Sequence, residues 1–399
     1  MSQQQTRSRA PGRWGRFGGR YTAEALWEPL EEIARYFDEA IADESFVAHF
    51  HRLLDRRVGR PTPLSQMVRL GEQLGGANLW LKREDLCQGG SFCANLAIFH
   101  ALLAARMDRT RLVGETSSGD FGVALGSAGA SLGLEVHIFM SREDIQNEPS
   151  RVAQMRHLGV VLHAVDANAR GRRLSGAEAM RFWIADLRHN HYATSMLTRP
   201  DPYPRMIGHV LDLIGAELRV QLRRLEILPD YIIAPVGTGG FAAGLFDAFV
   251  EDEHTQLVGV QAGGEPQAGR HAASLLSGGV GVFQGTFSNV LQDANGQLLK
   301  PYSIAGGLCS AGVGPQHAWW ATQGRVIYTT INDREAIEAA REIARTEGLT
   351  ISLESAHALS YALKLMPKLR PEQHILVGIS GEGSRDLDRI LPDAEERRS

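Results

Sequence analysis

The 399-residue sequence contains few cysteines, few lysines and no long apolar segment. Three cysteines are too few for a disulfide framework, and their number is typical of a reducing cytoplasm. No run of about 18 apolar residues predicts a transmembrane helix, and the arginine-rich first residues lack the apolar core of a signal peptide. A net charge of −4 gives no bulk attraction to nucleic acid or anionic membranes. We therefore expect a cytoplasmic protein that binds neither nucleic acid nor membrane.

Lysine is especially scarce. Among 42 basic residues only four are lysines, namely Lys82, Lys300, Lys364 and Lys368, and the rest are arginines. A genome with GC-rich codons would suffice to cause this composition. The scarcity is nevertheless informative for chemistry, because a reaction that requires a lysine amine has only these four candidates.

Short apolar runs alternate with longer helical patterns along most of the chain, which predicts an α/β fold. Such alternation is typical of parallel sheets with helices on both faces. The number of strands indicates two such sheets, with a central crevice as the ligand site. The expected strands are 79–82, 111–115, 136–140, 160–165, 231–236, 257–261, 326–330 and 375–380, and the expected helices include 94–106, 121–132, 206–225, 241–250, 333–347 and 354–366.

The two sheets are expected to belong to two interleaved domains. An N-terminal α/β domain would comprise residues 1–57 and 91–208, including a mobile subdomain around 108–195. A C-terminal α/β domain would comprise residues 58–90 and 209–399.

The clearest local signal is a glycine-rich turn between a predicted strand and a predicted helix, Gly237-Thr238-Gly239-Gly240-Phe241. Glycines let the backbone turn sharply and present N–H groups at a helix N-terminus, which suits a phosphate. The spacing also fits a dinucleotide fingerprint, but the next predicted strand carries no acidic residue for a ribose. A tight turn without a ligand is the simpler alternative.

A second strand-to-helix loop offers hydroxyl and N–H groups from Thr116, Ser117, Ser118 and Gly119. These groups suit a carboxylate or a phosphate, whereas Asp120 would repel such an anion. The alternative is that Ser118 and Asp120 cap the following helix.

A third loop begins at Ser380, where a predicted strand ends and a hydroxyl could face a crevice. Glu354 lies near the start of a predicted helix, where an acid also interacts favourably with the helix dipole. Two histidine pairs, at 49/51 and 189/191, have the spacing of metal ligands. Because no Cys or acidic ligand accompanies them, no metal site is predicted.

Taken together and in this order, the motifs resemble the β chain of tryptophan synthase, a family of fold-type II enzymes that use pyridoxal phosphate (PLP). The resemblance covers almost the whole chain and implies the two-domain α/β fold. The motifs that carry it are GRFGGRY (15–21), VGRPTPL (58–64), LKREDL (81–86), DPYP (201–204), GRHAASL (269–275), GVGPQHA (312–318), LESAHAL (353–359) and SGEG (380–383).

The sequence departs from the family where PLP is attached. In the family, a His-Lys pair ends the loop after LKREDL, and its lysine forms a Schiff base with PLP; here the pair falls on Phe92-Cys93. A thiol cannot form an imine, and the family does not use the lysine that corresponds to Lys82. PLP is thus implied as cofactor by the family, without covalent attachment, and the actual cofactor is left open.

Other pocket positions have changed as well. The family's phosphate loop ends Gly-Gly-Gly-Ser-Asn, whereas this one ends in Phe241, and each lost charge-assisted hydrogen bond costs roughly 1.5–3 kcal/mol. The substrate-carboxylate loop ends Gln-His in the family and Asp120-Phe121 here. The acid that closes over the substrate hydroxyl falls on Cys309.

Some family positions are kept. Glu115 matches the glutamate that assists dehydration and indole attack, Ser380 matches the partner of the pyridine nitrogen, and Glu354 also matches. The resemblance places Asn95 beside the changed pair as a further ligand-binding candidate.

By the same resemblance all three cysteines map to the pocket. Cys93 would lie near a helix N-terminus, where a thiolate is stabilised, and a nucleophilic Cys93 assisted by Glu115 is chemically reasonable. Alternatively, small apolar thiols fill space that a lysine has left. A soft-metal or haem-thiolate role lacks a histidine ligand.

Three functional hypotheses follow. The first is a diverged protein that binds an aromatic or amino-acid-derived small molecule without Schiff-base chemistry, and that catalyses a specialised reaction with Cys93 and Glu115. The second is a catalytically silent paralogue that regulates or scaffolds a genuine synthase subunit. The third is a conventional synthase that makes L-tryptophan from L-serine and indole with non-covalent PLP. The resemblance also implies a homodimer and an α-like or β-like synthase subunit as partner.

Overall fold

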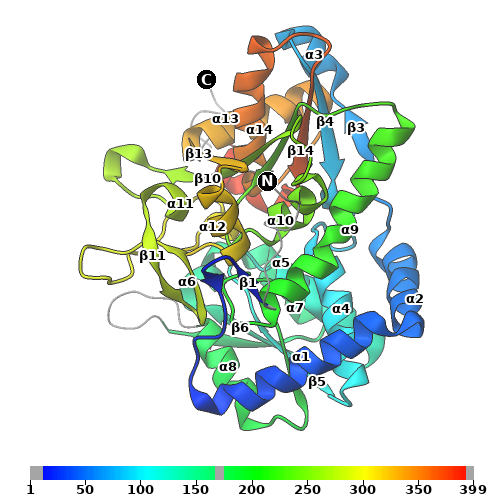
Figure 1. Cartoon of the computed structure of the whole chain (residues 1–399), viewed down its shortest axis with the longest axis vertical. Helices are drawn as coiled ribbons and strands as arrows, with labels where there is room; N and C mark the ends of the chain where they lie inside the picture. Colours follow the sequence, from blue (N-terminus) through cyan, green and yellow to red (C-terminus); the bar gives the residue numbers. More distant parts are fainter. Residues whose placement is uncertain (1–11, 167–174, 392–399) are drawn as a thin grey trace. The chain divides into compact units, whose positions relative to one another are not determined.

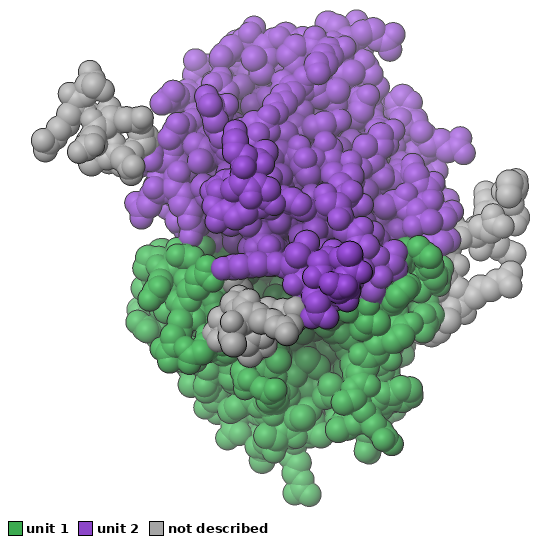
Figure 2. Space-filling model, turned by 90° about the vertical axis from the view of Figure 1, so that its left-hand side faces the viewer, with its two compact units in different colours: residues 1–61, 87–210, 282–287 green, residues 62–86, 211–281, 288–399 purple. Residues whose placement is uncertain are grey.

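The computed structural model describes residues 12–166 and 175–391. The chain divides into two compact units (Figure 2): unit 1 comprises Met1–Pro61, Cys87–Val210 and Val282–Phe287, and unit 2 comprises Thr62–Leu86, Leu211–Gly281 and Ser288–Ser399. The domain bounds expected from the sequence stay a prediction, and the expected mobile subdomain includes residues 167–174, which lie outside the described residues.

Unit 1 is built around a four-stranded, all-parallel sheet in the order β7-β6-β5-β8. Helices α4 and α5 pack against each other and against this sheet, and α8 packs against β5, β6 and β8 (Figure 1). The elements are α4 (Cys93–Arg106), β5 (Arg111–Glu115), α5 (Asp120–Leu132), β6 (Glu135–Ser141), α6 (Arg142–Asn147), α7 (Pro149–His157), β7 (Val161–Val165), α8 (Ser175–Ala185) and β8 (Asn190–Ala193).

The N-terminal helices α1 (Trp27–Ala42) and α2 (Glu44–Leu53) cover α4. Apolar residues recur at helical spacing in α1, so that one stripe is buried. The ring of Phe99 on α4 makes edge contacts with Phe37, Phe46 and Phe50 at centroid distances of 5.4–6.0 Å. This aromatic contact fixes α4, and with it the segment that contains Cys93, within unit 1. The short strands β1 (Arg13–Trp14) and β2 (Phe17–Gly18) also belong to unit 1.

Unit 2 is built around a six-stranded sheet in the order β13-β10-β9-β14-β4-β3, which is parallel except for β3. Helix α14 packs against α13 and against the central strands. The elements are β3 (Leu64–Gln66), α3 (Val68–Leu74), β4 (Asn78–Arg83), β9 (Tyr231–Pro235), α10 (Gly240–Phe246), β10 (Gln256–Gly264), α11 (Ser274–Ser277), α12 (Pro315–Thr322), β13 (Val326–Asn332), α13 (Asp333–Glu347), α14 (Leu353–Leu365), β14 (His374–Ile379) and α15 (Leu387–Ile390).

Three elements contain residues of both units, namely α9 (Tyr203–Arg224), β11 (Gly279–Phe283) and β12 (Thr286–Val290). All eight strands expected from the sequence are confirmed, with bounds that shift by a few residues, and so are the six expected helices. The sequence patterns missed β1, β2, β3, β8, β11 and β12; of these, β8 belongs to the parallel sheet of unit 1, and two of its four residues are the polar Asn190 and His191. Among the helices that the structure describes, none combines the length and the apolar character needed to cross a membrane.

Candidate functional site

The sheet order of unit 1 has a switch point between β5 and β8. From β5 the chain continues outward to β6 and β7, whereas β8 lies on the other side of β5. In parallel α/β sheets, ligands bind at the carboxyl ends of the strands beside such a point. Glu115 is the last residue of β5, and Thr194 follows directly after β8. The second loop identified in the sequence therefore lies where this fold positions functional groups.

The carboxylate of Glu115 is held by three side chains. Its Oε1 accepts hydrogen bonds from Arg199 Nη2 and Thr194 Oγ1, each at 2.8 Å, and its Oε2 accepts one from the Tyr192 hydroxyl at 2.7 Å. The side chains of Glu115 and Arg199 are 1% and 3% exposed. Burial alone would lower the pKa of Arg199, but Glu115 holds that pKa above its usual value. Glu115 is thus a fixed, paired group in unit 1.

The loop after β5 forms hydrogen bonds within itself. Gly119 N–H donates to Thr116 Oγ1 at 3.0 Å, and Asp120 N–H donates to Ser118 Oγ at 3.4 Å. Gly119 is the N-cap residue of α5 in a left-handed conformation, with a φ of 83° and no capping side chain. Phe121 is buried within α5, and Ser117 is half-buried.

Asp120 forms an ion pair with a residue that the sequence did not indicate. Arg151 Nε lies 3.0 Å from Asp120 Oδ1, and the two side chains are 3% and 14% exposed. Arg151 comes from α7, and its stem packs under Gly119 so closely that a Cβ on that glycine would lie 2.4 Å from Arg151 Cβ. A separation of 31 positions in the sequence gives no local pattern from which this pair could be predicted.

Cys93 is the first residue of α4 and is buried. Its N–H donates to Ser91 Oγ at 3.3 Å. In the same segment, Arg60 Nη1 donates to Asn95 Oδ1 at 3.1 Å and to the buried Cys87 Sγ at 3.9 Å. Cys93 therefore starts a helix that is buried along nearly its whole length, as the aromatic contacts of α4 require.

Phe92 precedes Cys93 as the N-cap residue of α4 and is half-buried. The Phe92 carbonyl accepts a hydrogen bond from Asn95 Nδ2 at 2.8 Å. This contact ties the first turn of α4 to the residue before it, so Phe92, Cys93 and Asn95 form one local group.

Unit 2 has its own switch point between β9 and β14. The chain runs from β9 outward to β10 and β13, and β14 and β4 lie on the opposite side. The residues 237–241 follow β9, and Ser380 follows β14. Because β9 and β14 are parallel neighbours, these two groups lie at the same edge of the sheet. Ser380 N–H donates to Ser355 Oγ at 2.9 Å, and the two hydroxyl oxygens lie 3.2 Å apart.

The glycine loop of unit 2 has room only for glycine at two positions. Gly239 has a φ of 99°, and a Cβ there would lie 2.2 Å from the His317 ring; a Cβ on Gly237 would lie 2.2 Å from Gly307 O. His317 Nε2 donates to Gly239 O at 2.8 Å, and burial lowers the pKa of His317 to about 4, so the ring is neutral. Gly240 and Phe241 open the seven-residue α10. Backbone N–H groups on such a loop fit a phosphate group.

Glu354 holds a second loop of unit 2. Its Oε1 accepts the Gly307 N–H and its Oε2 accepts Arg385 Nη2, both at 2.8 Å. Burial alone would raise the pKa of Glu354, but Arg385 and the Gly307 N–H lower that pKa to about 2. Cys309 lies two residues after Gly307, is half-buried and donates to Pro301 O at 3.4 Å. Glu354 thus positions the loop that contains Cys309.

The structure places the predicted site residues in two sets. Phe92, Cys93, Asn95, Glu115, Thr116, Ser117, Ser118, Gly119, Asp120 and Phe121 belong to unit 1, and Gly237, Thr238, Gly239, Gly240, Phe241, Cys309, Glu354 and Ser380 belong to unit 2. Within each unit the residues gather at the carboxyl ends of parallel strands or next to them. Their functional roles stay predictions.

Comparison with known proteins decides the family. The family model described as pyridoxal-phosphate dependent enzyme matches residues 56–381. The chain belongs to this family of pyridoxal-phosphate-dependent enzymes. It is 40% identical over 389 residues to a tryptophan synthase beta chain of Bordetella parapertussis, covering 96% of this chain and 97% of that protein, and 39% identical to the corresponding protein of Bordetella pertussis. The resemblance to tryptophan synthase β chains is therefore confirmed.

Two solved structures share the fold of this chain. An L-serine ammonia-lyase from Rhizomucor miehei has a TM-score of 0.63 and 21% identity, covering 82% of this chain and 96% of that one. An O-ureido-L-serine synthase has a TM-score of 0.64 and 18% identity, covering 86% and 93%. The α/β fold class expected from the sequence is confirmed.

Lysines matter in a pyridoxal-phosphate-dependent family, and all four lie in unit 2. Lys82 is fully buried on β4, where its Nζ donates to Thr62 O at 2.8 Å, to Gln221 Oε1 at 3.1 Å and to Glu217. The other three are exposed, and one of them, Lys364, pairs with Glu335 on α13. One lysine is thus locked in a buried ion pair, and three face solvent.

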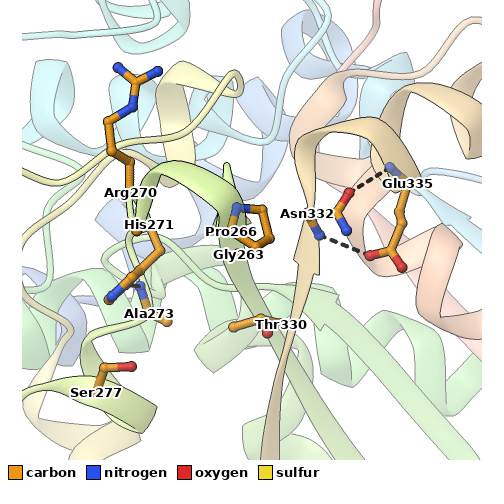
Figure 3. A pocket seen from close by; sticks show the side chains of 10 residues that line it. Gly263, Pro266, Arg270, His271, Ala273, Ser277, Thr330, Asn332 and Glu335 are labelled. Atoms are coloured by element: carbon orange, nitrogen blue, oxygen red, sulfur yellow. Dashed lines mark hydrogen bonds between the residues drawn. The ribbon is translucent and has the colours of Figure 1, made fainter.

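Unit 2 also contains a pocket of about 290 Å³ that none of the predicted site residues lines. It lies where β10 and β13 end as parallel neighbours. Figure 3 shows Asn332 and Glu335 joined by two hydrogen bonds, which form the capping box of α13, on the opposite side of the view from His271 and Ser277. The only sequence signal is the motif at 269–275. The lining residues are Gly263, Pro266, Gly269, Arg270, His271, Ala273, Ser277, Thr330, Asn332 and Glu335.

The histidine pairs noted in the sequence do not act as pairs. His49 and His51 are exposed on α2. His189 is exposed, whereas His191 is buried and its Nε2 lies 3.1 Å from His100 Nδ1. In the part of the chain that the structure describes, no group of three or more His, Cys, Asp or Glu residues is arranged to hold a metal ion.

Proposed function

We propose that the chain is a diverged relative of the tryptophan synthase β chain that binds PLP without a lysine link, together with an aromatic or amino-acid-derived small molecule. The observation that carries this proposal is the placement of the lysines. Unit 1, which contains Cys93, has no lysine, and Lys82 is committed to Glu217 and Thr62 inside unit 2. None of the four lysines lies in a loop that follows β5, β8, β9 or β14, the strands at the two switch points.

The residues of unit 2 fit the two ends of PLP. The backbone N–H groups at Thr238, Gly239 and Gly240 would hold the phosphate, and the Ser380 hydroxyl would accept or donate a hydrogen bond at the pyridine nitrogen. When bound, PLP supplies an electron-poor ring that stabilises negative charge on a ligand. Gly237 and Gly239 give this loop its tight turn, and a Cβ at either position would collide with Gly307 O or with the His317 ring.

Of the two residues expected to be catalytic, Cys93 keeps this role in the proposal, whereas Glu115 is proposed as a positioning residue. Cys93 at the first position of α4 is supported by the favourable field of a helix N-terminus for a thiolate. Glu115 is bound to Arg199, Tyr192 and Thr194, so a proton transfer by Glu115 would have to disrupt these bonds. We therefore assign proton transfer to Cys93, and we assign to Glu115 the orientation of the loop that follows β5.

The test is cofactor attachment. Purified protein is saturated with PLP, dialysed to remove PLP that exposed lysines bind reversibly, reduced with borohydride, digested, and searched by peptide mass spectrometry for a pyridoxyl group. We expect PLP to be retained on dialysis and no lysine to be labelled. Because the lysine that binds PLP in the family falls at position 93, a Cys93→Lys variant should become labelled there, whereas a Cys87→Lys variant, changed at another buried cysteine, should not.

Two results would contradict the proposal. Label on any of the four native lysines would mean that a conventional link forms. Loss of PLP on dialysis from the correctly folded wild type would favour a catalytically silent paralogue. The wild-type protein alone decides whether a native lysine is labelled and whether PLP is retained, so a variant that fails to fold does not affect the conclusion.

We also propose a homodimer that associates with an α-like or β-like synthase subunit in the cytoplasm. The support is the identity to proteins named tryptophan synthase beta chain over nearly their full length, and the three cysteines for the location. Light scattering of the purified chain, alone and with a synthase α subunit, measures this. A monomeric chain that forms no complex would contradict it.

A further inference from the structure

The backbone donors of the loop after β5 are largely used inside unit 1. Thr116 N–H donates to Phe139 O at 3.2 Å, Gly119 N–H donates to Thr116 Oγ1 at 3.0 Å, and Asp120 N–H lies 3.4 Å from Ser118 Oγ. A ligand carboxylate would have to replace these internal bonds. Such an exchange gives little net gain, because one hydrogen bond is lost for each that is made.

In the ion pair of Asp120 with Arg151 beside this loop, the acidic side chain is the more exposed of the two. Arg151 Nε lies 3.0 Å from Asp120 Oδ1, and Arg151 Nη1 donates to Gln154 Oε1 at 2.8 Å and to Gly89 O at 3.4 Å. The Arg151 side chain is 3% exposed and lies against Gly119, whereas the Asp120 side chain is 14% exposed. The acid is therefore the more exposed member of the pair, and its Oδ2 also accepts a hydrogen bond from Ser118 Oγ at 3.3 Å.

We propose that Asp120, held in place by Arg151, makes this loop select a ligand that carries an amine or a hydroxyl, and no carboxylate, at this position. This inference rests on the proposed function and adds the substrate class. A ligand carboxylate would face a like charge in a partly buried place, where repulsion is poorly screened. A protonated amine or a hydroxyl would instead donate a hydrogen bond to Asp120. Asp120 is thus a specificity-determining residue.

The experiment compares pairs of probes that differ only by the carboxylate. L-Serine is compared with ethanolamine, and L-tryptophan with tryptamine, by isothermal titration into the PLP-saturated protein. We expect the member without a carboxylate to bind about tenfold more tightly or better in at least one pair. In Asp120→Asn, which keeps the shape and removes the charge, that preference should fall to less than about threefold.

Controls separate this inference from the proposed function. Asp166→Asn removes the acid of an exposed Asp–Arg pair in unit 1, and it should leave the preference unchanged. If Asp120→Asn fails to fold because Arg151 loses its partner, the double variant Asp120→Asn/Arg151→Gln replaces it. Equal binding within both pairs, tighter binding of the amino acids, or no binding of any probe by the wild type would overturn the inference. Failure to retain PLP would instead overturn the proposed function, and the cofactor-free protein would then be titrated with the same pairs.

Discussion

Among the described residues, a buried glutamate–arginine pair lies next to the switch point of each unit, and the two pairs are built differently. Glu115 in unit 1 receives all of its hydrogen bonds from side chains, with Arg199 as its charged partner. Glu354 in unit 2 shares its hydrogen bonds between Arg385 and the backbone of Gly307. Unit 1 thus fixes its loop through side chains that are distant in sequence, and unit 2 fixes its loops through backbone groups and glycines.

This difference between the two units indicates at which positions a substitution can change the charge of a binding site. A site formed by backbone N–H groups tolerates side-chain changes as long as the glycines remain, which is the case at Gly237 and Gly239. A site formed by side chains changes its charge with each substitution. Asp120 in unit 1 is an example, because it places a carboxylate, paired with Arg151, at the N-terminus of α5.

Removal of Arg199 should have the largest effect. Arg199→Met leaves Glu115 as an uncompensated buried charge, so we expect the free energy of unfolding to fall by about 3–5 kcal/mol, measured by urea denaturation. The control Arg142→Met breaks an exposed pair with Asp166 and should cost about 1 kcal/mol or less. A similar small cost for Arg199→Met would show that the side-chain network of unit 1 contributes little to stability.

The sequence predicted what depends on local pattern. The apolar runs of eight strands and the turn at 237–241 lie within short windows, so periodicity and glycine spacing identify them. The pair Glu115–Arg199 spans 84 positions and Glu354–Arg385 spans 31, and neither window contains a repeating pattern. Such pairs depend on strand order, which one sequence does not specify. The strand β8 was missed for a related reason, because a buried strand that carries polar residues has no apolar run.

A methyl group on the glycine loop of unit 2 should have the next largest effect. In Gly239→Ala the new Cβ combines a φ of 99° with a contact of 2.2 Å to the His317 ring, so we expect a loss of about 2–4 kcal/mol and weaker retention of PLP. Gly348→Ala is the matched control, because Gly348 has a φ of 71° and no atom within 4 Å of the new Cβ. It should cost about 1 kcal/mol and leave PLP retention unchanged. Equal effects of the two variants would mean that backbone strain, and not the close approach to His317, governs this loop.

The smallest expected effect concerns the pH dependence of Glu354. Because folding lowers its pKa from 4.5 to about 2, its contribution to stability is complete above about pH 4.5 and is lost as the pH falls toward 2. Glu354→Gln removes the charge but keeps the shape, so it should cost about 1.5–3 kcal/mol at pH 7 and progressively less below pH 4, measured by urea denaturation across this range. Glu338→Gln, in an exposed pair with Arg334, should change stability little at any pH. If the cost of Glu354→Gln stays constant down to pH 3, the contacts of Glu354 with Gly307 and Arg385 do not depend on its negative charge. The contrast between the Glu115–Arg199 and Glu354–Arg385 pairs would then rest on geometry alone.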